Sequence, residues 1–156
     1  MKQTAMIIAV MSGVMTASAG AADYRVERTV QLDVPSTQVW HVAGDYCDID
    51  DWHPDISTCR VTVEGGKLFR VLTTTAGDEI TEQRIAAEQG LSYTYKLSDG
   101  GGPITKLTAT LSIEPNDGTL LSWAARFSSD DPAVEARVIA MFETGLAAIK
   151  RHIESE

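Results

Sequence analysis

The stretch VWHVAGDYCDIDDWHPDISTC, residues 39–59, packs two tryptophans, two histidines, two cysteines and five aspartates into 21 residues. Just before it, Pro35 suits the first turn of a helix, where its missing N–H is not needed. We therefore predict a short helix over residues 35–43, with Trp40 on its buried side. A further helical turn is predicted at residues 48–51, before Trp-His-Pro at 52–54, because a proline disfavours helical conformation in the residue before it.

The segments on either side have the periodicity of strands, and the last segment has that of a helix. Residues 24–32 alternate apolar and polar side chains, with Arg28 as the exception, which indicates a strand with one buried face. After the opening stretch, turn sequences separate six short segments rich in β-branched and aromatic residues. Residues 133–153 have helical spacing, and Asp130 or Asp131 can cap this helix. The sequence predicts an antiparallel meander followed by one long helix, in a single domain.

Residues 1–22 have the composition of a secretory signal peptide. Lys2 is the only charge before Asp23, and an apolar core is followed by small residues. The apolar run is shorter than the roughly 20 residues of a membrane-spanning helix. An uncleaved amphipathic anchor is the alternative. We expect cleavage, a mature domain over residues 23–156, and a location in the periplasm or outside the cell.

The charge of the mature chain limits its partners. Removal of Lys2 leaves 12 of the 13 basic residues beside 22 acidic ones, so the net charge is 12 − 22 = −10. Nucleic acid and anionic membrane surfaces are poor partners, because binding to phosphate groups requires clustered Lys and Arg. A small apolar molecule and a basic periplasmic protein are compatible partners.

The only two cysteines, Cys47 and Cys59, both lie in the opening stretch. An even number of cysteines in an exported chain favours a disulfide. Two unpaired buried thiols are the main alternative. A zinc site is a weaker one, because no CxxC motif accompanies the pair.

Metal-binding and catalytic motifs are scarce. His41 and Asp45 are four residues apart on the predicted helix, and His53 and Asp55 could add ligands, but a solvated helix face is the commoner origin of such a pair. The aspartates of residues 48–55 lack the glycine and the terminal glutamate of a calcium loop. No nucleophile triad, phosphate-binding loop or HExxH motif is present. We expect no metal and no cofactor.

Arg70 and Glu82 lie on segments joined by the turn at residues 76–78 and should be nearly opposite each other. If both point inward, they form a polar anchor in an apolar cavity, and a buried glutamate could act as a general acid or base. The alternative is an exposed cross-strand pair, worth a few tenths of a kcal/mol, since a bulge in either strand would reverse the facing.

Short motifs occur in a characteristic order along residues 24–153: Val34-Pro35, Val39-Trp40, Trp52-His53-Pro54, Cys59, Phe69-Arg70-Val71-Leu72, Ile80 with Glu82, Tyr93, Leu111, and Trp123 with Phe127. In this order they resemble the polyketide cyclase/dehydrase branch of the SRPBCC superfamily, also called START-like or Bet v 1-like. The resemblance implies an α+β helix-grip fold. In it a seven-stranded antiparallel curved sheet surrounds a long C-terminal helix, with two short helices after the first strand.

The resemblance also implies an apolar pocket for a lipid, sterol, hormone or polyketide. We expect an exported small-molecule-binding protein with a cavity of a few hundred Å³, entered near residues 99–103. Met141 and Gly145 should leave room on the last helix. The expected pocket residues are Trp40, Trp52, Arg70, Glu82, Tyr93, Tyr95, Trp123, Met141 and Gly145.

Two other functions fit the same features. A cyclase or dehydratase would use Glu82 as acid/base and Arg70 as a polarising group, although only some relatives are enzymes and the fold by itself implies no reaction. An accessory protein of a periplasmic redox enzyme, such as a methanol dehydrogenase system, would dock through the acidic face. Binding without catalysis is the leading hypothesis.

Overall fold

The computed structural model describes residues 20–156. The predicted signal peptide lies outside them, apart from residues 20–22, and stays a prediction. Among the described residues, no helix combines the length and the apolar character needed to cross a membrane. The elements are β1 (Ala22–Leu32), α1 (Ser36–Ala43), α2 (Ile49–Trp52), β2 (Ile56–Glu64), β3 (Lys67–Thr74), β4 (Glu79–Glu88), β5 (Ser92–Asp99), β6 (Ile104–Pro115), β7 (Thr119–Ser129) and α3 (Val134–Glu154).

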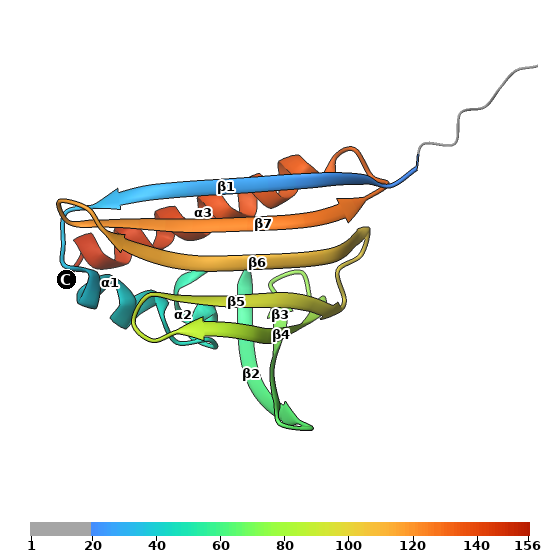
Figure 1. The fold of residues 1–156 in the computed structure, drawn as a ribbon, viewed down its shortest axis with the longest axis horizontal. Coiled ribbons are helices and arrows are strands. Elements are labelled where there is room, and N and C mark those ends of the chain that lie inside the picture. Colours follow the sequence, from blue (N-terminus) through green and yellow to red (C-terminus); the bar gives the residue numbers. More distant parts are fainter. Residues whose placement is uncertain (1–19) are drawn as a thin grey trace, which may run out of the picture.

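The seven strands form one antiparallel sheet in the order β1-β7-β6-β5-β4-β3-β2. Strands adjacent in sequence pair as hairpins from β2 to β7. β1 then joins β7, with Ala22 opposite Ser129 and Leu32 opposite Thr119. α3 lies behind β1, β7 and β6, and α1 and α2 connect the end of β1 to β2 (Figure 1). The predicted helix-grip fold, with its curved seven-stranded sheet and C-terminal helix, is confirmed.

β1 explains both the alternation in the sequence and its exception. Val26 and Leu32 are buried against the core. Between them, every second side chain points outward and is exposed. Arg28 lies on the inner side at the edge of the sheet, where its Nε donates a hydrogen bond of 2.9 Å to Oε1 of Glu143 on α3. The charged side chain therefore links the edge strand to the helix instead of interrupting the buried face.

α3 provides the apolar face that the sheet surrounds. Its 21 residues bury one stripe of side chains, and the ring of Phe142 stacks on Trp123 of β7 with 4.3 Å between centroids. Asp131, one of the two predicted caps, accepts a hydrogen bond from the N–H of Ala133 at 2.9 Å. The N-cap of α3 is Ala133, and no side chain caps the helix. The expectation that Asp130 or Asp131 is the cap is therefore wrong, and the carboxylate of Asp131 instead orders the turn before the first helical residue.

The predicted disulfide is confirmed. Cys47, in the loop after α1, is bonded to Cys59 of β2, with 5.5 Å between the Cα atoms. Oδ2 of Asp50 also accepts a hydrogen bond of 2.8 Å from the N–H of Cys59. α2 has only one turn, which buries Ile49 and Trp52 in the core. The disulfide and the hydrogen bond of Asp50 additionally hold the helical segment on the edge strand.

Candidate ligand-binding site

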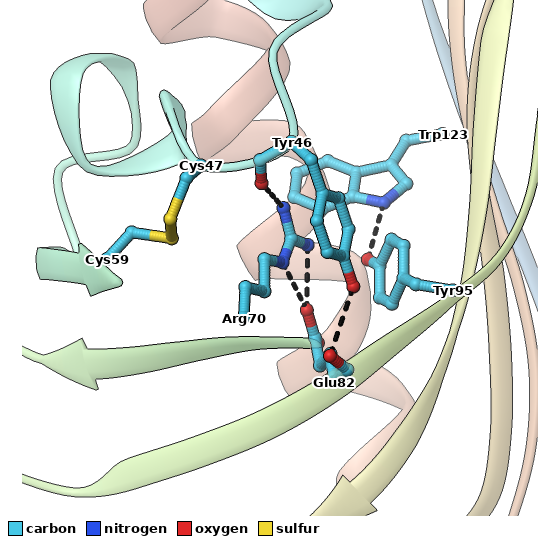
Figure 2. Close-up of polar contacts among 7 residues, drawn as sticks. All are labelled: Tyr46, Cys47, Cys59, Arg70, Glu82, Tyr95 and Trp123. Carbon is cyan, nitrogen blue, oxygen red and sulfur yellow. Dashed lines mark hydrogen bonds and ion pairs between the residues drawn. A yellow bond between two sulfur atoms is a disulfide. The ribbon is translucent and has the colours of Figure 1, made fainter. Parts of the chain in front are cut away.

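The site is organised around a buried ion pair between neighbouring strands. The register of β3 and β4 places Arg70 directly opposite Glu82, and both side chains point to the inner face, with exposed fractions of 0% and 8%. Nε of Arg70 donates to Oε2 of Glu82 at 2.7 Å. Nη2 lies 2.7 Å from the same oxygen, so two nitrogens converge on one carboxylate oxygen (Figure 2).

Tyr46 covers this pair from the helical side. Nη1 of Arg70 donates to the Tyr46 carbonyl at 2.7 Å, and the Tyr46 hydroxyl donates to the main-chain carbonyl of Glu82 at 3.2 Å. The guanidinium carbon lies 4.3 Å from the centre of the Tyr46 ring and 4.7 Å from that of Tyr95. Cation–π contacts of this kind stabilise a desolvated cation, so Arg70 is held in one orientation.

The surroundings keep the arginine charged and the tyrosines protonated. Burial by itself lowers the pKa of Arg70, but the attraction of Glu82 and of the tyrosines outweighs it, so the pKa lies above its usual value. Burial raises the pKa of Tyr95 well above its usual value, and it raises the pKa of Tyr46 against the opposing effect of Arg70. At neutral pH Arg70 is therefore charged, and the hydroxyl groups of Tyr46 and Tyr95 are neutral.

Within residues 20–156, two atoms of the ion pair lack a well-aligned hydrogen bond, although one of them, Nη2 of Arg70, contacts Oε2 of Glu82. Nη2 of Arg70 is buried without a hydrogen bond of acceptable geometry. Oε1 of Glu82 receives no hydrogen bond, because the contacts of Arg70 go to Oε2. A buried donor without a well-aligned acceptor, such as Nη2 of Arg70, is costly and calls for an explanation, such as a water molecule or a ligand.

Both residues line an internal cavity of about 110 Å³. Its wall also contains His53, Gly100 and Gly101, so the loop after β5 borders it as expected for an entrance. The remaining lining is mostly apolar and comes from both layers: Ile49, Ile56, Leu72, Ile80, Tyr95, Leu97, Ile104, Leu107, Trp123 and Met141.

The cavity is smaller than the few hundred Å³ that we expected, and Gly145 explains why. A Cβ at this position would lie 2.7 Å from Cδ2 of His53 and 2.8 Å from Cζ3 of Trp123. The missing side chain therefore allows two rings to approach α3 and fill the space. The expectation that Gly145 leaves room for a ligand is wrong.

Of the nine expected pocket residues, the structure places Arg70, Glu82, Tyr95, Trp123 and Met141 at the cavity wall. The other four do not line it. Besides Gly145, they are aromatic residues that pack in the core. Trp52 meets Trp123 edge-on at 5.8 Å between centroids, Tyr93 meets Tyr46 in the same way at 5.4 Å, and Trp40 lies 6.1 Å from Tyr93.

His53, considered as a metal ligand from the sequence, is engaged in the core. Its Nδ1 accepts a hydrogen bond from the N–H of Asp55 at 3.1 Å, which leaves the proton on Nε2 to be donated to the Met141 carbonyl at 3.0 Å. Neither nitrogen is free to bind a metal. Nowhere in residues 20–156 do three His, Cys, Asp or Glu side chains gather in a way that could hold one.

Tyr46 is the functional residue that the sequence reasoning missed. It directly precedes Cys47, and the disulfide to Cys59 fixes this part of the loop beside β2 and β3. Once the disulfide is assumed, an aromatic residue next to Cys47 is a candidate for covering the inner face of β3. The signal was in the sequence but depended on the pairing of the cysteines.

A protein-family model, described as polyketide cyclase/dehydrase and lipid transport, matches residues 23–154. The chain belongs to the polyketide cyclase/dehydrase family. The match covers the sheet from Asp23 onward and all of α3, so the family assignment applies to the complete helix-grip domain. No curated protein sequence matches the chain.

Solved structures of the same architecture agree with the family assignment. The protein XoxI from Bacillus cereus is 23% identical over 83% of this chain and 94% of its own, with a TM-score of 0.74. An aromatase/cyclase from Streptomyces sp. R1128 is 16% identical over 85% and 94%, with a TM-score of 0.70. Norcoclaurine synthase from Thalictrum flavum, in complex with dopamine and hydroxybenzaldehyde, is 13% identical over 98% of both chains, with a TM-score of 0.63. At these low identities, the TM-scores show that the three proteins share the fold of this chain.

Proposed function

We propose that this polyketide cyclase/dehydrase-family domain binds a small apolar molecule with one hydroxyl group in the cavity between the sheet and α3. The observation that carries the proposal is a pair of polar atoms in an otherwise mostly apolar wall. Nη2 of Arg70 contacts Oε2 of Glu82 without a well-aligned hydrogen bond, and Oε1 of Glu82 accepts no hydrogen bond from Arg70. A hydroxyl group both donates and accepts. One such group could satisfy both atoms, while the apolar wall binds the rest of the ligand.

The size of the cavity indicates the size of the ligand. An apolar cavity of about 150 Å³ is known to bind benzene, and the cavity of this domain measures about 110 Å³. Without a change in shape, the cavity has room for at most a single small ring or a short branched chain. A sterol or a polyketide would require the cavity to enlarge, for example by movement of the loop at Gly100 and Gly101.

The proposal includes export, with residues 1–22 removed as a signal peptide. The disulfide between Cys47 and Cys59 supports this location, since disulfides persist in oxidising compartments and are rare in the cytosol. N-terminal sequencing of the protein recovered from the periplasm or the medium tests it. A first residue between Gly20 and Asp23 is expected, and a protein that still starts at Met1 would contradict export with cleavage.

Binding of phenol, compared with toluene, tests the ligand site. We expect calorimetry to detect phenol binding, and toluene to bind at least about tenfold more weakly because it leaves the polar atoms unpartnered. Met141→Trp should fill the cavity and abolish binding of both, whereas the matched control Met141→Leu should retain it. If the filled variant folds and binds phenol as well as the wild type does, the cavity is not the binding site.

A cyclase or dehydratase is the second candidate, and the same ion pair favours it. Glu82 could transfer a proton through Oε1 and Arg70 could polarise a carbonyl, since both reach the cavity. Glu82→Gln should then abolish turnover of a polyketide-like substrate while ligand binding persists. Docking on a periplasmic redox enzyme through the acidic face stays a prediction, tested by whether such an enzyme co-purifies with the exported protein.

A further inference from the structure

Three basic side chains gather on the outer face of the sheet, opposite to α3. Arg25 of β1 lies directly across from Arg126 of β7. Arg126 in turn lies across from Thr108 of β6, two residues after Lys106. All three basic residues are exposed, and their strands lie side by side at the top of the sheet (Figure 1).

The three charges are not compensated. Neither arginine nor the lysine takes part in an ion pair within residues 20–156, and the sequence contains no acidic residue before Asp23. Yet the whole chain has a net charge of −9, with 22 acidic residues for 13 basic ones. Like charges directly opposite each other on a sheet are destabilising. An acidic protein therefore maintains a local cluster of positive charge without a carboxylate bound to it.

The backbone at Lys106 is also unfavourable. Its φ angle is +53°, in the left-handed region that a residue with a side chain rarely adopts. It lies in a bulge of β6 between Thr105 and Thr108, and glycine would adopt this conformation without strain. Strained residues of this kind cluster at functional sites. Here the bulge lies next to the pairing of Thr108 with Arg126, and Lys106 lines the same groove as Arg126.

The cluster borders a surface groove of about 550 Å³. Tyr24, Phe127 and Ser128 complete its wall with Asp23, whose Oδ1 accepts a hydrogen bond from the Ser128 hydroxyl at 2.5 Å. Three cations and one carboxylate leave the groove with two positive charges. The groove lies on the opposite face of the sheet from the cavity, so it is separate from the proposed ligand site.

We propose that this groove binds a small organic dianion, either a phosphate monoester or a dicarboxylate. Two arginines side by side offer the planar paired donors that match carboxylate and phosphate oxygens, and the lysine adds a point charge. A bound dianion would neutralise the groove and remove the repulsion between Arg25 and Arg126. A long polyanion is not the partner, since only three cations line the groove and the rest of the chain is acidic.

Amide NMR tests the proposal. The wild-type chain is titrated with inorganic phosphate and, separately, with succinate, and chloride at matched ionic strength is the control. Saturable shifts are expected around Arg25, Lys106 and Arg126 with at least one of the two dianions, and the dianion that produces them distinguishes phosphate from dicarboxylate. Arg126→Gln should weaken binding by at least about tenfold. The matched control Arg60→Gln changes another exposed arginine on β2, outside the groove, and should bind like the wild type.

Lys106→Gly separates a binding role from a structural one. Glycine relieves the strain at this backbone position, so the variant should melt at a higher temperature than the wild type while it binds the dianion more weakly. The proposal is overturned if neither dianion binds more tightly than chloride, or if Arg126→Gln and Lys106→Gly both bind as the wild type does.

Discussion

The arginines on the two faces of the sheet lie in opposite environments. On the inner face Arg70 is fully buried, paired with Glu82 and enclosed by tyrosine rings. On the outer face Arg25 and Arg126 are exposed, adjacent and without a carboxylate partner among the described residues. The inner charge is neutralised, so it can orient a neutral ligand but attracts no ion. The outer charges are not neutralised, so they can attract an anion.

The bulge of β6 connects these two faces. Ile104 and Leu107 line the inner cavity, while Lys106 between them lines the outer groove. A bulge adds one residue to a strand and changes where the neighbouring side chains point. One local irregularity therefore supplies apolar wall to one site and a cation to the other.

The largest expected effect comes from breaking the inner pair. Glu82→Ala leaves the buried guanidinium of Arg70 without its carboxylate, which should lower the free energy of unfolding by about 3–5 kcal/mol. On the outer face, Arg126→Gln should change it by no more than about 0.5 kcal/mol. Chemical denaturation measures both. Equal effects for the two variants would mean that burial does not distinguish the two faces.

Removal of the disulfide tests what holds Tyr46 over the inner pair. The bond closes a loop with a sequence separation of 12, so the double variant Cys47→Ser/Cys59→Ser should lose about 3 kcal/mol in the chain-entropy model. Reduction of the wild type should have the same effect, and thermal melting with and without reductant measures it. A melting temperature that does not respond to reductant would show that the hydrogen bonds of Tyr46 suffice.

Gly145→Ala tests how tightly the inner face is packed. The new Cβ would meet His53 and Trp123 within 3 Å, and overpacking of this kind typically costs about 1–3 kcal/mol. Ala148→Ser changes another small residue of the same helix, one that is exposed to an intermediate degree, and should cost less than about 1 kcal/mol. If Gly145→Ala were as stable as the wild type, the rings could move aside and the cavity could enlarge.

The smallest expected effect on stability depends on pH and concerns the buried imidazole of His53. Burial lowers the pKa of His53, against smaller raising effects of the Met141 carbonyl and of Asp55. Below about pH 6.5 the unfolded chain takes up this proton while the folded protein does not. The full free energy of unfolding should therefore be present above that pH. Below it, the free energy of unfolding should fall by up to about 1.4 kcal/mol per pH unit, until the pKa of His53 in the folded protein is reached.

His53→Gln removes the titrating group and keeps a donor for the Met141 carbonyl. Its stability should be lower but nearly independent of pH between 7 and 5.5, measured by urea denaturation at several pH values. The same slope in wild type and variant would assign the pH dependence to other residues.

The sequence by itself determined the fold. Alternation along β1, turn residues between the later strands and the apolar stripe of α3 each follow from local periodicity, which a single chain displays directly. It also placed Arg70 nearly opposite Glu82, because a short turn joins their strands, but it left open whether the two side chains face inward, and the structure decided that. A disulfide was the favoured interpretation of two cysteines in an exported chain. Only the tertiary structure, which brings the two Cα atoms close together, decided that the bond forms.

Only the tertiary structure decided which inward residues meet the cavity. Trp52 and Tyr93 have the same apolar character as Trp123, but Trp52 at the end of α2 packs edge-on against Trp123, and Tyr93 packs edge-on against Tyr46, so neither lines the cavity. Gly145 was expected to open space and instead admits two rings, since the absence of a side chain allows close approach as readily as it leaves a void. Cavity volume depends on how side chains from distant elements fill a common space, and that information is not local to any segment of the chain.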